Sequence, residues 1–198
     1  MPNPLSPRIE ELLRRIQELE TELESDLESR RREFRYRIEN HRVRFEQDMR
    51  TMQARLRRSS LRYLMEAPLL YLLTAPVIYG AIFQLLLLDA TVSVYQQICF
   101  RVYDIPRVKR SDHFAFDRGL LPYLNWIERL NCAYCSYGNG LMAYAREIVA
   151  RTEQFWCPIK HARHLKHHHD HYHRFFEYGD GSAYRTELER IRKDFPPQ

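Results

Sequence analysis

The feature that most constrains this chain is an unbroken run of 21 uncharged residues from Pro68 to Leu88, PLLYLLTAPVIYGAIFQLLLL. A helix of about this length spans a hydrocarbon core of roughly 30 Å. A core helix of a soluble protein rarely continues so far without a charged residue. The run therefore predicts a membrane segment, with the lipid bilayer as a partner.

This apolar stretch continues past Asp89 to Phe100, so the whole membrane segment, 67–100, is long for one upright span and short for two. We expect either one span followed by an interfacial helix, or a short hairpin. Basic residues flank both ends in equal number, and this tie favours a hairpin with both ends in the cytoplasm. Asp89 would then lie at a turn near the head groups, the alternative being a proton or ion contact.

The first 66 residues have the character of a long charged helix. Ser6 and Pro7 are a helix-start signal, and no glycine or proline follows before Pro68, so one helix is expected over 8–62. Its apolar residues recur every three or four positions, which predicts a coiled coil and self-association or a protein partner. An acidic block precedes a basic block, so a parallel dimer would place like charges together and a bend near residue 29 would place opposite charges together. Solvated charges on an exposed face remain an equal alternative.

Arginines without any acidic residue fill the stretch 49–65, directly before the membrane segment. Such a cluster favours anionic lipid head groups. No nucleic-acid-binding motif accompanies it, so no specific nucleic-acid partner is expected.

Three of the four cysteines lie with histidines in the segment 101–178, which is interpreted as a small helical metal-binding domain. Cys132, Cys135, Cys157 and His161 form a C-x2-C and C-x3-H set, the ligand types of a closed tetrahedral zinc site. We expect one helix over 120–131, a tight turn at the glycines after Cys135, and a second helix that returns Cys157 to the first pair. An iron–sulfur cluster is the alternative cofactor.

The histidines of the run 164–173 could bind a second metal ion or sense pH, but an exposed stretch without a specific role is favoured, since consecutive side chains point in several directions. Glu128, Glu147 and Glu153 are candidate general bases beside a metal-bound water. The alternative for these three is pairing on a solvated face with neighbouring arginines, Arg129, Arg146 and Arg151. No catalytic motif decides whether the chain is an enzyme.

The sequences NCAYCSYGNG and ARTEQFWCPIKHA, within about 107–178, resemble an uncharacterised group of bacterial membrane-associated proteins with CxxC and CPxKH motifs. The group has no assigned activity. The resemblance implies the bacterial inner membrane and gives no mechanism.

These observations predict an all-α protein with four parts, 1–66, 67–100, 101–178 and a polar tail at 179–198. The expected function is a membrane-anchored zinc protein that acts as a structural or interaction module, with the metal domain in the cytoplasm. Two alternatives stay open: a membrane-bound metalloenzyme or iron–sulfur redox protein, and a histidine-rich metal-handling protein.

Overall fold

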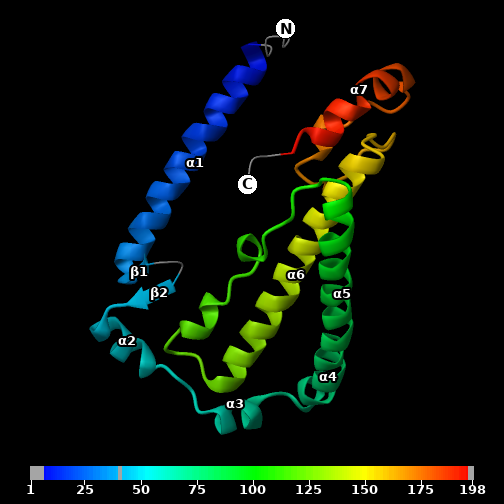
Figure 1. The fold of residues 1–198 in the computed structure, drawn as a ribbon. Helices are drawn as coiled ribbons and strands as arrows, with labels where there is room; N and C mark the ends of the chain where they lie inside the picture. The colour runs from blue at the N-terminus through cyan, green and yellow to red at the C-terminus, as the bar shows by residue number, and fades with distance from the viewer. Residues whose placement is uncertain (1–6, 40–41, 196–198) are drawn as a thin grey trace. The chain divides into compact units, whose positions relative to one another are not determined.

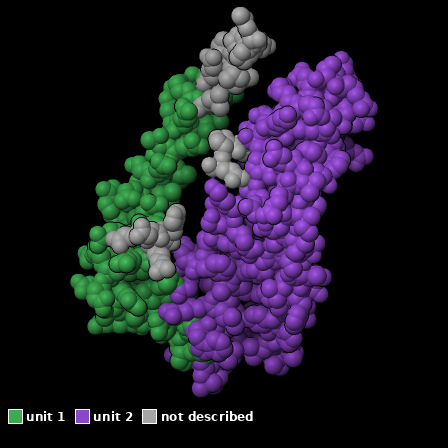
Figure 2. Space-filling view, viewed as in Figure 1, with its two compact units in different colours: residues 1–60, 120–125 green, residues 61–119, 126–198 purple. Residues whose placement is uncertain are grey.

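The computed structural model describes residues 7–39 and 42–195, and it is mostly helical (Figure 1). This confirms the all-α prediction in outline, although two short strands interrupt the N-terminal region. The chain divides into two compact units, which Figure 2 colours separately. Unit 1 comprises residues 1–60 and 120–125, and unit 2 comprises residues 61–119 and 126–198.

Unit 1 does not contain the single helix that was predicted over 8–62. Its elements are α1 (Pro7–Glu33), β1 (Tyr36–Glu39), β2 (Arg42–Phe45) and α2 (Gln47–Ala54). The helix prediction is wrong because apolar and charged residues alternate with a period of two through Y-R-I-E and R-V-R-F, the pattern of a strand rather than a helix. Arg35 leaves α1 in the left-handed region, with φ of 49°, and so turns the chain into β1.

The two strands form an antiparallel pair in which Tyr36 lies opposite Phe45 and Ile38 lies opposite Val43. Successive side chains of a strand point to opposite faces, so these four residues share one face. The Tyr36 and Phe45 rings lie 5.6 Å apart between centroids. The segment 120–125 joins this unit through the Arg57 guanidinium, which donates two hydrogen bonds, of 3.0 and 2.8 Å, to the carbonyl of Pro122.

Unit 2 is built on two long helical rods. The first consists of α4 (Leu69–Gly80), α5 (Ile82–Tyr95) and a π-helical turn, η1 (Gln96–Phe100), and the second is α6 (Trp126–Trp156). Two shorter α-helices are α3 (Ser60–Glu66), at the boundary with unit 1, and α7 (Gly181–Lys193). The 3-10 turns are η2 (Arg110–Asp112), η3 (Asp117–Leu120) and η4 (Tyr172–Arg174).

The first rod is the predicted membrane segment. Leu69–Phe100 is one helix, 32 residues long, and is long and apolar enough to cross a membrane. The expected hairpin with a turn at Asp89 is wrong, because Asp89 lies within α5. Its carboxylate is paired there with Arg110, so a helical position does not leave the charge without a partner. The chain instead deviates from regular α-helix at Ala81, after Pro76 and Gly80.

The two rods run side by side in the same direction (Figure 1). Tyr79 bonds Asn131 near the start of α6, and Tyr95 bonds Thr152 near its end, so residue numbers rise together along both helices. A parallel pair needs a connection that returns along its whole length. Residues 101–125 make this return, and the part in unit 2, 101–119, packs against both rods.

Helix α6 runs without interruption through the glycines that were expected to form a tight turn. The prediction of two helices joined at residues 136–140 is therefore wrong. Gly140 instead serves close packing: a Cβ atom there would lie 2.8 Å from the Phe114 ring and 2.9 Å from the His113 carbonyl oxygen. The missing side chain lets the return segment approach α6.

The core of unit 2 lies where α5, α6 and the return segment meet. Phe100, Leu141, Tyr144 and Ile148 are each at most 1% exposed. Ile105 and Val108, from the return segment, complete this cluster of buried side chains. Burial of this apolar surface stabilises the parallel rods and fixes the side-chain clusters described next.

Candidate functional site

The four predicted metal ligands are not brought together. Cys132 and Cys135 lie in the first half of α6, whereas Cys157 follows its last residue and His161 lies four residues further on. The 22-residue separation of Cys135 and Cys157 corresponds to about 33 Å along a helix. Zinc–ligand bonds are about 2.0–2.3 Å long, so one ion cannot bind both pairs in this arrangement.

Among the described residues, no three histidine, cysteine or acidic side chains are placed to hold a metal ion. Partial burial raises the pKa of the Cys157 thiol, and the negative charge of Glu153 raises it further. The zinc ion and the alternative iron–sulfur cluster remain predictions from the sequence.

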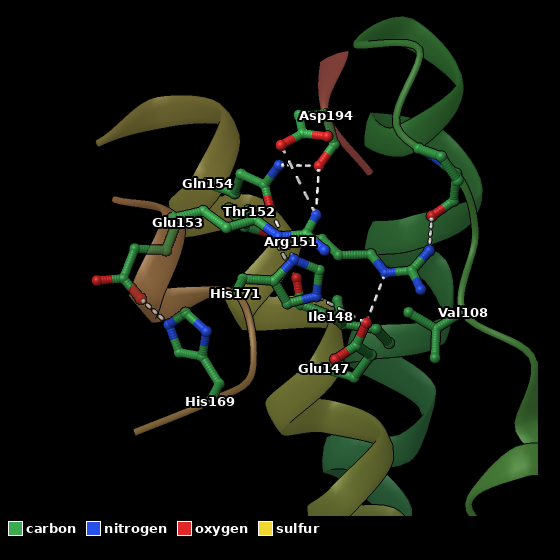
Figure 3. A network of polar contacts seen from close by, with 12 residues as sticks. Val108, Glu147, Ile148, Arg151, Thr152, Glu153, Gln154, His169, His171 and Asp194 are labelled. Atoms are coloured by element: carbon green, nitrogen blue, oxygen red, sulfur yellow. Dashed lines mark hydrogen bonds and ion pairs between the residues drawn. The ribbon is translucent and has the colours of Figure 1, made fainter. Parts of the chain in front are cut away.

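The histidine-rich segment between α6 and α7 contains two residues that differ from the rest. His169 and His171 turn towards α6, and His171 is only 4% exposed (Figure 3). The histidines at 161, 164, 167, 168 and 173 are exposed. The interpretation of the whole run as a stretch without a specific role is therefore too simple, because its last part is anchored to the helix.

His171 is held between two acceptors (Figure 3). Its Nε2 lies 3.1 Å from the Glu147 carboxylate, and its Nδ1 lies 2.6 Å from Gln154 Oε1. The amide nitrogen of Gln154 donates to the carbonyls of Ile191 and Asp194, at 2.9 Å each, so its oxygen is the atom left to face His171. His171 is therefore hydrogen-bonded to α6 through both ring nitrogens.

Glu147 is the acidic centre of this network. The hydrogen bond from His171 lowers its pKa to about 2; burial opposes this shift, and a 2.8 Å bond from Arg151 contributes to it. The Arg151 Nη1 atom also donates to the carbonyl of Pro106 at 2.6 Å. The network therefore ties α6 to the return segment, the histidine-rich segment and the end of α7.

This geometry bears on the predicted general bases. The expected pairing of Glu147 with Arg151 is confirmed, but Arg151 is buried rather than on a solvated face. A carboxylate with a pKa near 2 is a weak base at neutral pH. Glu153 lies 2.9 Å from His169 Nε2 rather than beside Arg151. Both acids hold histidines in place, which is a structural use of their charge.

A second polar cluster lies where α5, α6 and η2 meet. Arg110 donates two hydrogen bonds, of 2.5 and 2.9 Å, to the Asp89 carboxylate, and the Tyr137 hydroxyl donates a third at 2.9 Å. Ser93 adds a 3.2 Å bond from one turn along α5. The charge of Asp89 is thus matched inside the protein, which favours a structural role over an ion contact.

An apolar cavity of about 510 Å³ lies between α3, α4 and the first turns of α6. Its walls are mainly aliphatic and aromatic, and its polar groups include Asn131, which accepts a hydrogen bond from the Tyr79 hydroxyl. A cavity of this size and lining suits an apolar chain or ring. Its lining includes Tyr63, Leu64, Tyr71, Leu72, Trp126, Leu130 and Tyr134.

No protein-family model, curated protein or solved structure matches the chain. The resemblance to bacterial membrane-associated proteins therefore remains a prediction. Sequence reasoning also missed Gln154 and Arg110, because a single polar residue gives no local signal of a partner that lies 17 or 21 positions away.

Proposed function

We propose that the protein is a membrane-anchored interaction module, with α4–α5 as its membrane element and its polar groups held at the membrane surface. The supporting observation is a continuous apolar face on this rod. Side chains spaced mainly four residues apart on it are 57–77% exposed: Leu69, Leu73, Val77, Phe83, Leu87 and Val94. A face of this size in water would be costly, and a bilayer removes the cost.

The opposite side of the rod faces protein. Asp89 and Gln96 form hydrogen bonds there with α6 and the return segment, and Ser93 accepts one from Arg110 of the return segment. The apolar and polar sides of α5 therefore differ in their surroundings. This is the division expected of a helix that lies between lipid and protein.

The length of the rod and the charged return segment beside it favour insertion along the membrane plane. A rod of 32 residues is about 48 Å long, more than the roughly 30 Å of a hydrocarbon core. The irregular return segment beside it carries charged residues, including Asp104, Lys109 and Asp117. Irregular backbone exposed to lipid cannot cross hydrocarbon, so we place the return segment in the head-group region and both ends of the rod on one side. The resemblance implies a bacterial inner membrane, and the equal basic flanks of the segment favour the cytoplasm as this side.

Flotation of the purified full-length protein with lipid vesicles tests the anchor. Wild type is expected to float, and Leu73→Glu combined with Leu87→Glu is expected to weaken vesicle binding at least tenfold, since each change removes about 1.5–3 kcal/mol of apolar burial. Leu56→Glu is the matched control, because Leu56 is 73% exposed in unit 1, outside the apolar face. A wild type that stays unbound would refute the anchor.

Protease protection tests the orientation separately. Tags at the two termini should both be digested when protein-containing membranes are treated from one side. Protection of one tag alone would show that the rod crosses the bilayer, and would replace the in-plane arrangement while leaving the anchor intact.

A further inference from the structure

Helix α1 carries an apolar stripe that unit 1 does not cover. Leu12, Ile16, Leu19 and Leu23 are each 51–59% exposed, although they recur at intervals of four, three and four residues. This spacing forms one narrow seam along a helix. Leucine and isoleucine at such positions require a partner of matching shape.

We propose that this seam is the interface of a parallel, two-stranded coiled coil formed with α1 of a second copy of the chain. In the heptad repeat, residues 9, 16 and 23 occupy position a, and residues 12, 19 and 26 occupy position d. The first two a positions are isoleucine and the first two d positions are leucine. This combination favours parallel dimers over larger assemblies.

The charges beside the seam are complementary in this arrangement. Arg15 occupies position g and Glu20 occupies position e of the next heptad, the two positions that meet between chains in a parallel dimer. They lie five positions apart, so they do not face each other within one helix. Among the described residues, neither forms an ion pair within its own chain. A dimer would therefore contain two symmetric Arg15–Glu20 pairs.

The other charged residues of α1 do not prevent this pairing. Of the six acidic residues in 18–28, Glu18, Glu24 and Glu28 lie at the outer positions c, b and f. Glu22, at position g, would meet Leu27 at position e of the second copy, so it does not face a like charge. Arg14, at position f, is bonded to Glu11 and Glu18 of its own helix. Asp26 at position d is the exception, because it would face Asp26 of the second copy. The interface is therefore expected to be strongest before residue 26.

Charge reversal in the full-length, detergent-solubilised protein tests the proposal. Energy transfer between differently labelled copies measures the dissociation constant of the dimer. Arg15→Glu turns two attractive pairs into repulsive ones and should raise the dissociation constant about tenfold or more. Combining Arg15→Glu with Glu20→Arg should restore the wild-type constant. Glu24→Arg is the matched control, because position b faces solvent, and it should change the constant less than twofold.

The partner residue that restores binding reports the orientation. In an antiparallel pair the residue opposite Arg15 would be Glu22, so rescue by Glu22→Arg instead of Glu20→Arg would overturn the parallel arrangement. A wild type that is monomeric, or a dimer that responds to neither reversal, would overturn the interface itself. Asp26→Leu should lower the dissociation constant of the dimer, because it replaces two facing carboxylates of the seam by leucines.

Discussion

The two halves of α6 are held in the fold by different physical means. The first half, next to α4 and the start of α5, has no charged residue between Arg129 and Arg146 and packs through aromatic rings and close backbone contact at Gly140. The second half is held by a buried network centred on Glu147, Gln154 and His171. The second half therefore depends on this charged network in addition to the buried side chains of Tyr144 and Ile148, whereas the first half depends mainly on volume and shape.

This difference determines how each half should respond to substitution. Added volume should disturb the first half, since packed side chains cannot move apart without loss of contact. A change of charge or pH should disturb the second half, since its hydrogen bonds need specific protonation states. Three variants separate these responses.

The largest effect is expected at the close contact of the first half. Gly140→Ala should lower the free energy of unfolding by about 2 kcal/mol, as overpacking typically costs 1–3 kcal/mol. The new Cβ would meet the His113 carbonyl, and backbone cannot move aside as easily as a side chain. Chemical unfolding in detergent, followed by circular dichroism, measures the change.

Gly138→Ala is the matched control in the same helix. Its Cβ would meet only the Leu85 side chain, at an ordinary 3.6 Å, and alanine favours a helix over glycine by about 0.8–1 kcal/mol. This variant should be as stable as wild type or more stable. Equal loss in both variants would show that α6 does not pack at Gly140 as described.

A smaller effect is expected in the second half. Glu147→Gln should lower the free energy of unfolding at pH 7 by about 1.5 kcal/mol, because it removes a charged acceptor from His171 and Arg151. The folded pKa of Glu147, about 2, lies below its ordinary value of 4.5, so the folded state binds fewer protons. The carboxylate therefore contributes stability above about pH 4.5, and this is lost as pH falls towards 2.

A pH series checks this assignment. Wild type should lose stability between pH 4.5 and 2 more steeply than Glu147→Gln, which has no carboxylate to protonate at that position. Parallel curves for the two proteins would contradict the role of Glu147.

The smallest effect concerns the cysteines at the two ends of α6. Because α6 separates Cys132 from Cys157, the stability changes of Cys132→Ser and Cys157→Ser should add in the double variant to within about 0.5 kcal/mol. A shared zinc ion would give another result: each single variant would then cost nearly as much as the double. Metal analysis of the same proteins would identify that ion.

The sequence predicted the regular parts of this fold better than its interruptions. The apolar run 68–88 gave the first rod, and leucine spacing gave the seam of α1. The strands β1 and β2 are not predicted, because each alternating pattern is only four residues long and no glycine or proline marks a break in the helix there. Gly138 and Gly140 were assigned to a turn, although glycine is also used where backbone must approach a helix closely.

The candidate sites also depend on contacts that the local sequence does not predict. The spacing of Cys132, Cys135, Cys157 and His161 predicts a zinc site only if the helix between them bends, and local sequence does not contain that information. The buried position of His171 could not be found from the run of histidines, because its two acceptors lie 24 and 17 residues earlier in the chain.

By itself, the sequence determined the apolar character of 68–88, the amphipathic seam of α1 and the helical class of the protein, because these depend on neighbouring residues and a fixed helical period. Only the tertiary structure decided that α5 and α6 run parallel, that Asp89 pairs with Arg110, and that His171 is buried against Glu147. Those features depend on contacts between residues far apart in the chain. The free energy of such contacts comes from packing and desolvation, which no local pattern records.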